Sequence, residues 1–233
     1  MPIWVAFLIT FGTAVIWLRL IDFFVVKGWL TNRLSRKIIH VGTGPIFVLC
    51  WILFPDLPLS RYVAAIIPLL ISVQFFLVGI GVIKDIAAVE AMSRSGDPRE
   101  ILKGPFFYGI VFVILTIVFW KNYPAGLISL MILCGGDGLA DIVGRRVPSM
   151  PLPWSRGKTI AGTLAMFFGS VLFSSTILWF FVQYGGLQLS VDGWFVRLCI
   201  ISLGATLVES IPLRDFDNLT VPFVSIILSL ILF

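Results

Sequence analysis

The chain has 233 residues, of which 59% are hydrophobic and 12% are charged, and its mean hydropathy is +1.05. Soluble domains carry about 25% charged residues, so this composition excludes a water-soluble globular fold and indicates a protein embedded in lipid. The net charge of +5 would suggest a nucleic acid partner in a soluble protein, but basic loops explain it in a membrane protein, and no nucleic acid is expected. Three separated cysteines and one histidine indicate neither a disulfide framework nor a zinc site.

Apolar runs that could cross a bilayer follow one another along the chain. A crossing needs about 20 mostly apolar residues. We therefore predict an all-α, polytopic integral membrane protein with eight transmembrane helices, or seven if the short last run, which contains Pro222, does not cross. Residues 1–233 are expected to form one transmembrane domain. The predicted helices cover residues 4–26, 38–54, 62–83, 105–120, 124–144, 160–182, 194–209 and 219–233.

The basic residues indicate the orientation of these helices. With the N-terminus outside, thirteen of the seventeen Lys and Arg residues fall in inner segments, and only Arg61 and Lys121 fall in outer loops. The inner segments are 27–37, 84–103, 145–158 and the loop with Arg214. This predicts an N-out multi-pass protein, in the cell membrane if the source is prokaryotic, with its active site on the cytoplasmic side. Within 84–103, residues 86–92 could form a short amphipathic helix on the membrane surface or belong to a solvated connector.

The segment CGGDGLADIVGRR holds two acidic residues inside a predicted span. Asp137 and Asp141 are four residues apart, so a helix places both carboxylates on one face. Carboxylates in a membrane are costly and usually functional, and such a pair suits Mg²⁺. Gly136 and Gly138 would let a ligand approach the backbone. The structural alternative is a helix braced by an Asp141–Arg145 pair, with the glycines serving helix packing.

The segment WSRGKTIAGT lies at the start of the next predicted helix. Gly157, Lys158 and Thr159 could meet phosphate through the free backbone N–H groups of the helix and the lysine ammonium. The segment is not a Walker A loop, because that pattern requires Gly where the chain has Leu152. A basic loop with a threonine cap is the structural alternative.

The segment ESIPLRDFDNLTVP supplies more oxygen ligands on the predicted inner face. Glu209 ends one span, while Asp215, Asp217 and Asn218 precede the next. A polar turn is an equally good interpretation of this segment alone.

The segment RKIIHVGTG places Arg36, Lys37 and His40 at the inner end of the second span. Arg36 and His40 share a helical face, so these residues could bind an anionic ligand, and His40 could transfer a proton. The alternatives are a topological role for the two cations and a packing role for His40.

Five segments occur in the order found in CTP-dependent lipid-alcohol kinases. They are RKIIHVGTG, KGPFFYGIVF, GGDGLADIVGRR, GKTIAGTLAM and ESIPLRDFDNLTVP, and the chain resembles this family of phytol, farnesol and dolichol kinases over about residues 36–222. The resemblance implies Mg²⁺-dependent transfer of the CTP γ-phosphate to a membrane isoprenoid alcohol. The sequence does not choose among phytol, farnesol, geranylgeraniol, polyprenol and diacylglycerol as the alcohol. The family commonly has Glu where this chain has Ala161.

On this interpretation, each candidate residue has an expected role. The catalytic residues are Asp137, Asp141 and Lys158. The Mg²⁺ ligands are Asp137, Asp141, Glu209 and Asp217. The nucleotide and its phosphates are bound by Gly136, Gly138, Arg145, Arg146, Gly157, Thr159, Arg36, Lys37, His40 and Asn218.

Two other functions fit parts of the sequence. CTP:phosphatidate cytidylyltransferases resemble this family around GDGLADIVGRR and GKT, but they usually end in a histidine-containing signature, and His40 is the only histidine here. A transporter whose buried acids bind ions would more often show repeated halves, which this sequence lacks.

Overall fold

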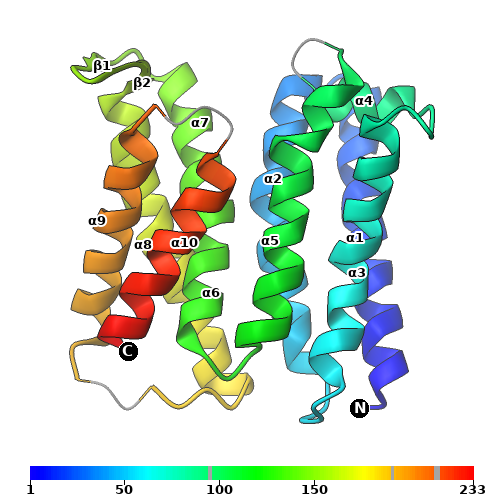
Figure 1. Cartoon of the computed structure of the whole chain (residues 1–233), viewed down its shortest axis with the longest axis vertical. Helices are drawn as coiled ribbons and strands as arrows, with labels where there is room; N and C mark the ends of the chain where they lie inside the picture. The colour runs from blue at the N-terminus through cyan, green and yellow to red at the C-terminus, as the bar shows by residue number, and fades with distance from the viewer. Residues whose placement is uncertain (94–95, 190–191, 213–215) are drawn as a thin grey trace.

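The protein, represented by a computed structural model, is a bundle of helices capped at one end by a two-stranded hairpin (Figure 1). The structure describes residues 1–93, 96–189, 192–212 and 216–233, apart from the side chains at positions 22, 32, 33, 36, 87, 90 and 91. The all-α prediction is confirmed, with the hairpin as a small addition. The helices are α1 (Ile3–Val26), α2 (Asn32–Leu49), α3 (Ser60–Gly79), α4 (Ile86–Met92), α5 (Gly104–Phe119), α6 (Pro124–Met131), α7 (Asp137–Arg146), α8 (Ile160–Tyr184), α9 (Trp194–Ser210) and α10 (Asp217–Leu232). Shorter helical turns are η1 (Cys50–Leu53), η2 (Pro98–Leu102) and η3 (Ile132–Gly136), and β1 (Pro151–Leu152) pairs antiparallel with β2 (Ser155–Thr159).

Five helical segments in the described residues are long and apolar enough to cross a membrane. The prediction of seven or eight spans is therefore wrong by this measure, because it counted apolar runs that form shorter helices. At 1.5 Å per residue, the 16 residues of α10 extend about 24 Å, less than the roughly 30 Å of a bilayer core. The five segments are Ile3–Val26, Ser60–Gly79, Pro98–Phe119, Pro124–Arg146 and Ile160–Tyr184, while Lys37–Leu53 and Asp217–Leu232 are apolar but shorter.

The two ends of the bundle differ. The connections after α1 and α3, together with α4 and the β1–β2 hairpin, lie at one end, which we call the hairpin end; both chain termini lie at the other, the terminus end (Figure 1). The basic segments 27–37, 84–103 and 145–158 thus share one end, as the charge distribution predicts. The short helix predicted at 86–92 is confirmed as α4. Which side of a membrane the hairpin end faces stays a prediction, and Arg214 lies outside the described residues.

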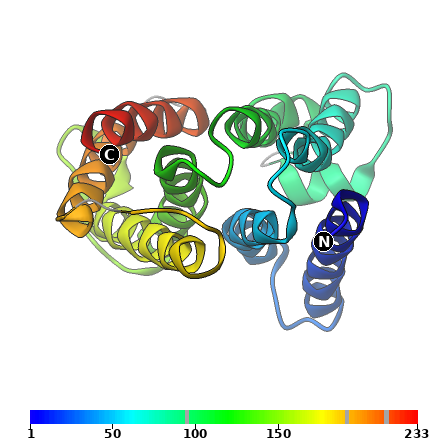
Figure 2. The same ribbon diagram turned by 90° about the horizontal axis from the view of Figure 1, so that it is seen from below.

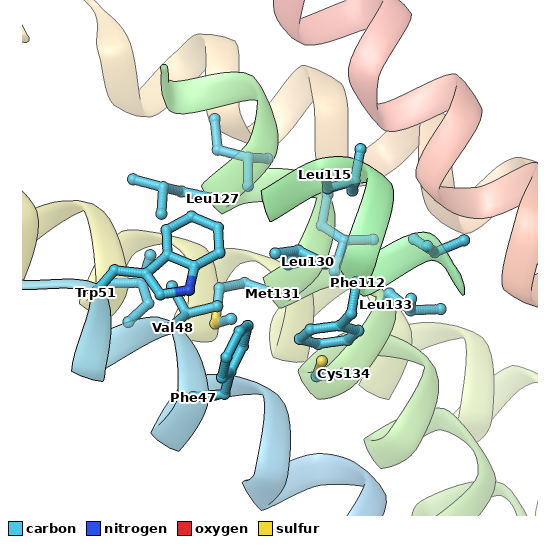
Figure 3. Close-up of a cluster of buried hydrophobic side chains, with 14 of the residues drawn as sticks. Phe47, Val48, Trp51, Phe112, Leu115, Leu127, Leu130, Met131, Leu133 and Cys134 are labelled. Atoms are coloured by element: carbon cyan, nitrogen blue, oxygen red, sulfur yellow. The ribbon is translucent and has the colours of Figure 1, made fainter. Parts of the chain in front are cut away.

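The segment formed by α6, η3 and α7 is the central helix of the bundle. In its apolar stretch of 18 residues, 72% of the residues are buried inside the protein, whereas the figure for the corresponding stretch of α1 is 11%. Seen along the bundle, α6 lies among α8, α10 and α5 (Figure 2). Large apolar side chains from α2, η1 and α5, including Phe47, Trp51 and Phe112, pack around it (Figure 3). This packing carries the end of the central helix, with Asp137 and Asp141, into the interior near the hairpin end.

Candidate active site

The two aspartates of α7 face a lysine and a histidine of α2. Asp137 begins α7 directly after the π-helical turn η3, and such turns are frequent at functional sites. Its Oδ2 lies 3.4 Å from Nε2 of His40, while Oδ2 of Asp141 lies 3.1 Å from Nζ of Lys37. The structure therefore brings together two pairs of residues that the sequence places about 100 positions apart.

Asp141 has a second cationic partner on its own helix. Nε of Arg145 donates to its Oδ1 at 2.6 Å, which is the contact that the structural alternative predicts. Lys37 approaches the other carboxylate oxygen from α2, so the aspartate joins two helices instead of bracing one. The side chain of Asp141 keeps about a quarter of its surface exposed, which leaves it open to a ligand.

Lys158 on β2 forms a second charged group at the same end. Its Nζ lies 2.6 Å from Oε1 of Glu209 on α9 and 3.2 Å from Oδ2 of Asp217 on α10, and it also donates to the backbone carbonyl of Glu209. Burial acts to lower the pKa of Lys158, but the two carboxylates outweigh it and hold this pKa above its usual value. Lys158 is therefore a positive charge that ties the hairpin to α9 and α10.

Asp137 links the two charged groups. It lies near enough to Lys158 and Glu209 for their charges to interact with its own. We call Lys37, His40, Asp137, Asp141 and Arg145 the aspartate group, and Lys158, Glu209 and Asp217 the lysine group. Together the two groups bring acidic and basic side chains of α2, α7, β2, α9 and α10 to the hairpin end, and we call them the charged network.

A cavity of about 470 Å³ opens beside the aspartate group. This volume is within the range of small-molecule sites. Three cationic side chains in its wall face one carboxylate, a balance that favours an anionic ligand such as phosphate. Gly157, Lys158 and Thr159 do not line it, so the predicted phosphate-binding residues are divided between two places. The lining residues are Thr31, Leu34, Lys37, Asp141, Ile142, Arg145 and Arg146.

The start of α8 corrects one expectation. The sequence predicts free N–H groups there, but the first three are hydrogen-bonded within the protein and are closed to a phosphate. The hairpin and the Thr159 cap satisfy them. The acceptors are the Met150 carbonyl for Ile160, Ser149 Oγ for Ala161 and Thr159 Oγ1 for Gly162, at 3.0, 3.0 and 3.2 Å. Gly157 is exposed, with open space where a side chain would be.

Two predicted glycines serve helix packing. A β-carbon at Gly136 would meet Oγ of Ser170 on α8, and one at Gly138 would meet Cγ2 of Val41 on α2. Both glycines therefore allow α7 and η3 to approach their neighbours, as the structural alternative predicts. Their contact with a nucleotide stays a prediction.

The remaining candidates lie around this site. Nδ2 of Asn218 donates to the carbonyl of Gly104 at 2.9 Å and ties α10 to the start of α5. The side chain of Arg36, and all of Asp215, lie outside the described residues.

Tyr108 of α5 contributes a contact that the sequence did not indicate. Its hydroxyl donates to the backbone carbonyl of His40 at 3.0 Å and lies 3.1 Å from Sγ of Cys134, while its ring centroid is 4.4 Å from that of His40. Tyr108 thus holds α2 against η3 immediately beside Asp137. Tyr108 lies in KGPFFYGIVF, one of the five family segments, but no residue of that segment was assigned a role, because a neutral aromatic in an apolar run looks like a lipid-facing residue.

The charged network fits a metal that arrives with a nucleotide. Among the described residues, no group of three or more His, Cys, Asp or Glu side chains is arranged to hold a metal ion. Mg²⁺ is usually held by one or two carboxylates together with substrate phosphates, and does not need an all-protein cage. The partly exposed Asp137 and Asp141, beside a cationic cavity, provide such a donor set.

Curated proteins resemble the chain over most of its length. A probable chloroplastic phytol kinase of Triticum aestivum is 38% identical over 217 residues, which covers 92% of this chain and 72% of that protein. The chain belongs to the phytol and farnesol kinase family. Phytol kinase 1 of Arabidopsis thaliana is 35% identical over 200 residues, covering 85% of this chain and 66% of that protein, and the farnesol kinase of the same plant is 36% identical over 209 residues, covering 89% and 68%. No family model and no solved structure matches the chain.

Proposed function

We propose that this protein is a kinase that phosphorylates a membrane isoprenoid alcohol of the phytol or farnesol type, with CTP as donor and Mg²⁺ as cofactor. Membership of the phytol and farnesol kinase family supports phosphoryl transfer to an isoprenoid alcohol. The apolar helices support a lipid substrate, because an isoprenoid alcohol is dissolved in the membrane in which these helices lie. The choice of CTP rests on the resemblance of the five ordered segments.

One observation carries the proposal: the aspartate group and its cationic cavity lie at the end of a bundle of apolar helices. Phosphoryl transfer depends mainly on positioning the reactants and neutralising charge. Lys37, Arg145 and Arg146 line the cavity and would bind the phosphates. Asp137 and Asp141 would hold Mg²⁺, which neutralises charge on the transferred phosphoryl group.

The lysine group has a positioning role in this proposal. Lys158 is held by Glu209 and Asp217, and its charge also acts on Asp137. It would therefore set the position of β2 and the charge around Asp137, and could turn toward a phosphate if its carboxylate partners turned toward the metal. The hairpin end would face the cytoplasm, in keeping with the basic residues gathered there.

A product assay tests the proposal directly. Purified protein in lipid nanodiscs is given CTP, Mg²⁺ and phytol, farnesol or geranylgeraniol, and both nucleotide and lipid products are measured. The proposal predicts release of CDP together with the alcohol monophosphate, and slower turnover with ATP. Pyrophosphate release with phosphatidate would instead identify a cytidylyltransferase. If neither CDP nor pyrophosphate is released, both enzyme functions are contradicted, and an ion-coupled transporter becomes the function to test.

A further inference from the structure

A second cavity, of about 420 Å³, lies at the terminus end, opposite the candidate active site (Figure 1). The connections between η1 and α3, between α5 and α6, and after α8 meet around it. Since these segments are far apart in sequence, the cavity is formed by the fold and not by one loop. Its lining residues are Asp56, Leu57, Pro58, Arg61, Trp120, Asn122, Gly185 and Gly186.

The charges around this cavity leave one positive side chain in its wall. Nζ of Lys121 is buried, lying 2.7 Å from Oδ1 of Asp56 and donating to the Phe54 carbonyl at 2.9 Å, so the lysine neutralises that carboxylate. Nη1 of Arg61 donates to the backbone carbonyl of Ile117 at 3.3 Å. No carboxylate of the described residues forms an ion pair with Arg61. Because the buried Lys121 already pairs with Asp56, Arg61 is the charged lining residue left for an anionic ligand, and its guanidinium suits phosphate.

The backbone at the cavity is strained. Trp120 has φ +34°, in the left-handed region that bulky residues rarely adopt. Its ring stacks on that of Trp51, with the ring centroids 4.9 Å apart, and lies edge-on to the ring of Phe54. This packing holds the strained conformation. Strained residues that the surrounding fold maintains gather at binding and catalytic sites.

The residues near the cavity suit a bilayer interface. Leu57, Leu59, Tyr62 and Tyr123 are each about half exposed and lie in or beside the connections that form it. Tyrosine is enriched at the level of lipid headgroups, because its ring is apolar and its hydroxyl is polar. In a membrane, these residues would place the mouth of the cavity at the depth of phospholipid phosphates.

We propose that this cavity binds the phosphodiester of a phospholipid headgroup in the membrane leaflet away from the active site. Arg61 would pair with the phosphate, and the side-chain amide of Asn122 would donate to it. A phosphodiester carries one negative charge, which matches the single uncompensated cation of the wall. This site is independent of the kinase proposal, since it shares no residue with the aspartate or lysine group.

Native mass spectrometry of the detergent-solubilised protein tests this site with three probes. The probes are dioctanoyl phosphatidylglycerol, dioctanoylglycerol, which has the same tails without phosphate, and inorganic phosphate. We expect phosphatidylglycerol to bind at least about tenfold more tightly than either of the others, as loss of one charge-assisted hydrogen bond implies. Inorganic phosphate binding as tightly as the lipid would overturn the lipid assignment.

Two variants locate the binding. Arg61→Gln removes the cation, and Asn122→Asp adds a negative charge at an exposed turn where folding tolerates the change. Each should weaken phosphatidylglycerol binding about tenfold or more. The matched control is Arg197→Gln, because Arg197 lies near the same end and donates to the Leu232 carbonyl. Unchanged lipid binding in both variants would overturn the proposal, and a similar loss in Arg197→Gln would do so too.

Discussion

Asp137 and Asp141 lie near the hairpin end of the bundle with about a fifth of each side chain exposed, and basic side chains contact both carboxylates. A charged residue within a membrane costs about 2.5–3.5 kcal/mol on insertion scales when nothing compensates it. His40, Lys37 and Arg145 supply that compensation. Because these partners are themselves polar and near a cavity, they can exchange contacts when a phosphate or metal enters. The paired aspartates are thus available for binding.

Replacing either aspartate by asparagine should stop turnover with little change in shape. We expect Asp137→Asn and Asp141→Asn each to lower kcat at least about a hundredfold, as loss of electrostatic stabilisation does. Asp141→Asn should also lower Tm more than Asp137→Asn does, since it leaves Lys37 and Arg145 without their shared counter-charge. Steady-state kinetics and thermal unfolding measure both effects, with the exposed Asp192→Asn as control. Near-normal kcat in both variants would show that the pair is structural.

Lys158 should act on both nucleotide binding and stability. In Lys158→Ala, the KM for CTP should rise more than kcat falls, because the charge around the nucleotide becomes more negative. Tm should also fall, since Glu209 and Asp217 lose the cation between them. Lys158→Arg keeps the charge and should recover most of the Tm. An unchanged KM for CTP in Lys158→Ala would remove Lys158 from the binding residues and leave it a purely structural one.

The Tyr108 hydroxyl should matter more than its position in an apolar helix suggests. Tyr108→Phe keeps the ring against His40 but loses the hydrogen bond to the His40 carbonyl. A hydrogen bond contributes about 1 kcal/mol, so we expect a small fall in Tm and a fall of about five- to tenfold in kcat, with KM for the nucleotide little changed. The exposed Tyr123→Phe is the control. A loss of Tm without any fall in kcat would contradict a positioning role.

At the scale of elements, α7 and α8 approach so closely that a side chain at Gly162 would be crowded. A β-carbon at Gly162 would lie 3.0 Å from the Ala140 carbonyl oxygen and 3.1 Å from Cα of Gly144. Both are backbone atoms, so they cannot move aside as a side chain can. The spacing of these two helices also fixes where Asp141 meets α2.

Gly162→Val should therefore separate α7 from α8. We expect destabilisation of about 1–3 kcal/mol, as overpacking usually costs, together with loss of turnover. Thermal unfolding in detergent checks the stability, and phosphorylation of the alcohol checks the site. Gly12→Ala in α1 is the control, because a β-carbon there meets open space and alanine favours the helix. Equal stability of the two variants would show that the close approach is not required.

Sequence patterns predicted some of these elements better than others. The helix at 86–92 follows from its composition and turn residues, and α1 and α8 follow from long apolar runs. The hairpin was missed because β1 is only two residues long and gives no alternating pattern. The π-helical turn η3 was also missed, since its apolar residues continue the pattern of the surrounding helix.

The candidate residues could be found from sequence because charges inside apolar runs are conspicuous. Asp137 and Asp141 stand out for that reason, whereas Lys158 stands out as a lysine beside Gly157 at the start of a predicted helix. Their pairing could not be predicted, because Lys37 is about one hundred residues from Asp141 and either residue had other possible partners. The candidates for phosphate binding are divided between two places, since Lys37, Arg145 and Arg146 line the cavity and Lys158 is ion-paired on the hairpin. This division also depends on tertiary packing and could not be predicted from the sequence.

At the scale of the whole molecule, the basic segments gathered at the hairpin end predict that this end of the bundle faces one side of the membrane, the cytoplasmic side. Lys84→Cys and Arg156→Cys, made in a Cys199→Ser background, should both be labelled by a membrane-impermeant thiol reagent from the cytoplasmic side. Asn122→Cys should be labelled only from the opposite side. All three positions are exposed, while the other two native cysteines are buried. Labelling of Lys84→Cys and Arg156→Cys from opposite sides would contradict the shared face.

The helices on the two flanks of the bundle differ in length. With 24 residues, α1 extends about 36 Å, whereas α10 extends about 24 Å, and the two lie on opposite flanks (Figure 2). A bilayer of uniform thickness cannot match both lengths, so lipid that borders the whole of α10 would have to thin, while α1 would tilt. We therefore expect the surrounding lipid to be compressed on one side, and enzymes reconstituted in shorter-chain lipids to be the less strained. On the thinned side, the hydroxyl group of an isoprenoid alcohol dissolved in the bilayer would lie nearer to the depth of the charged network.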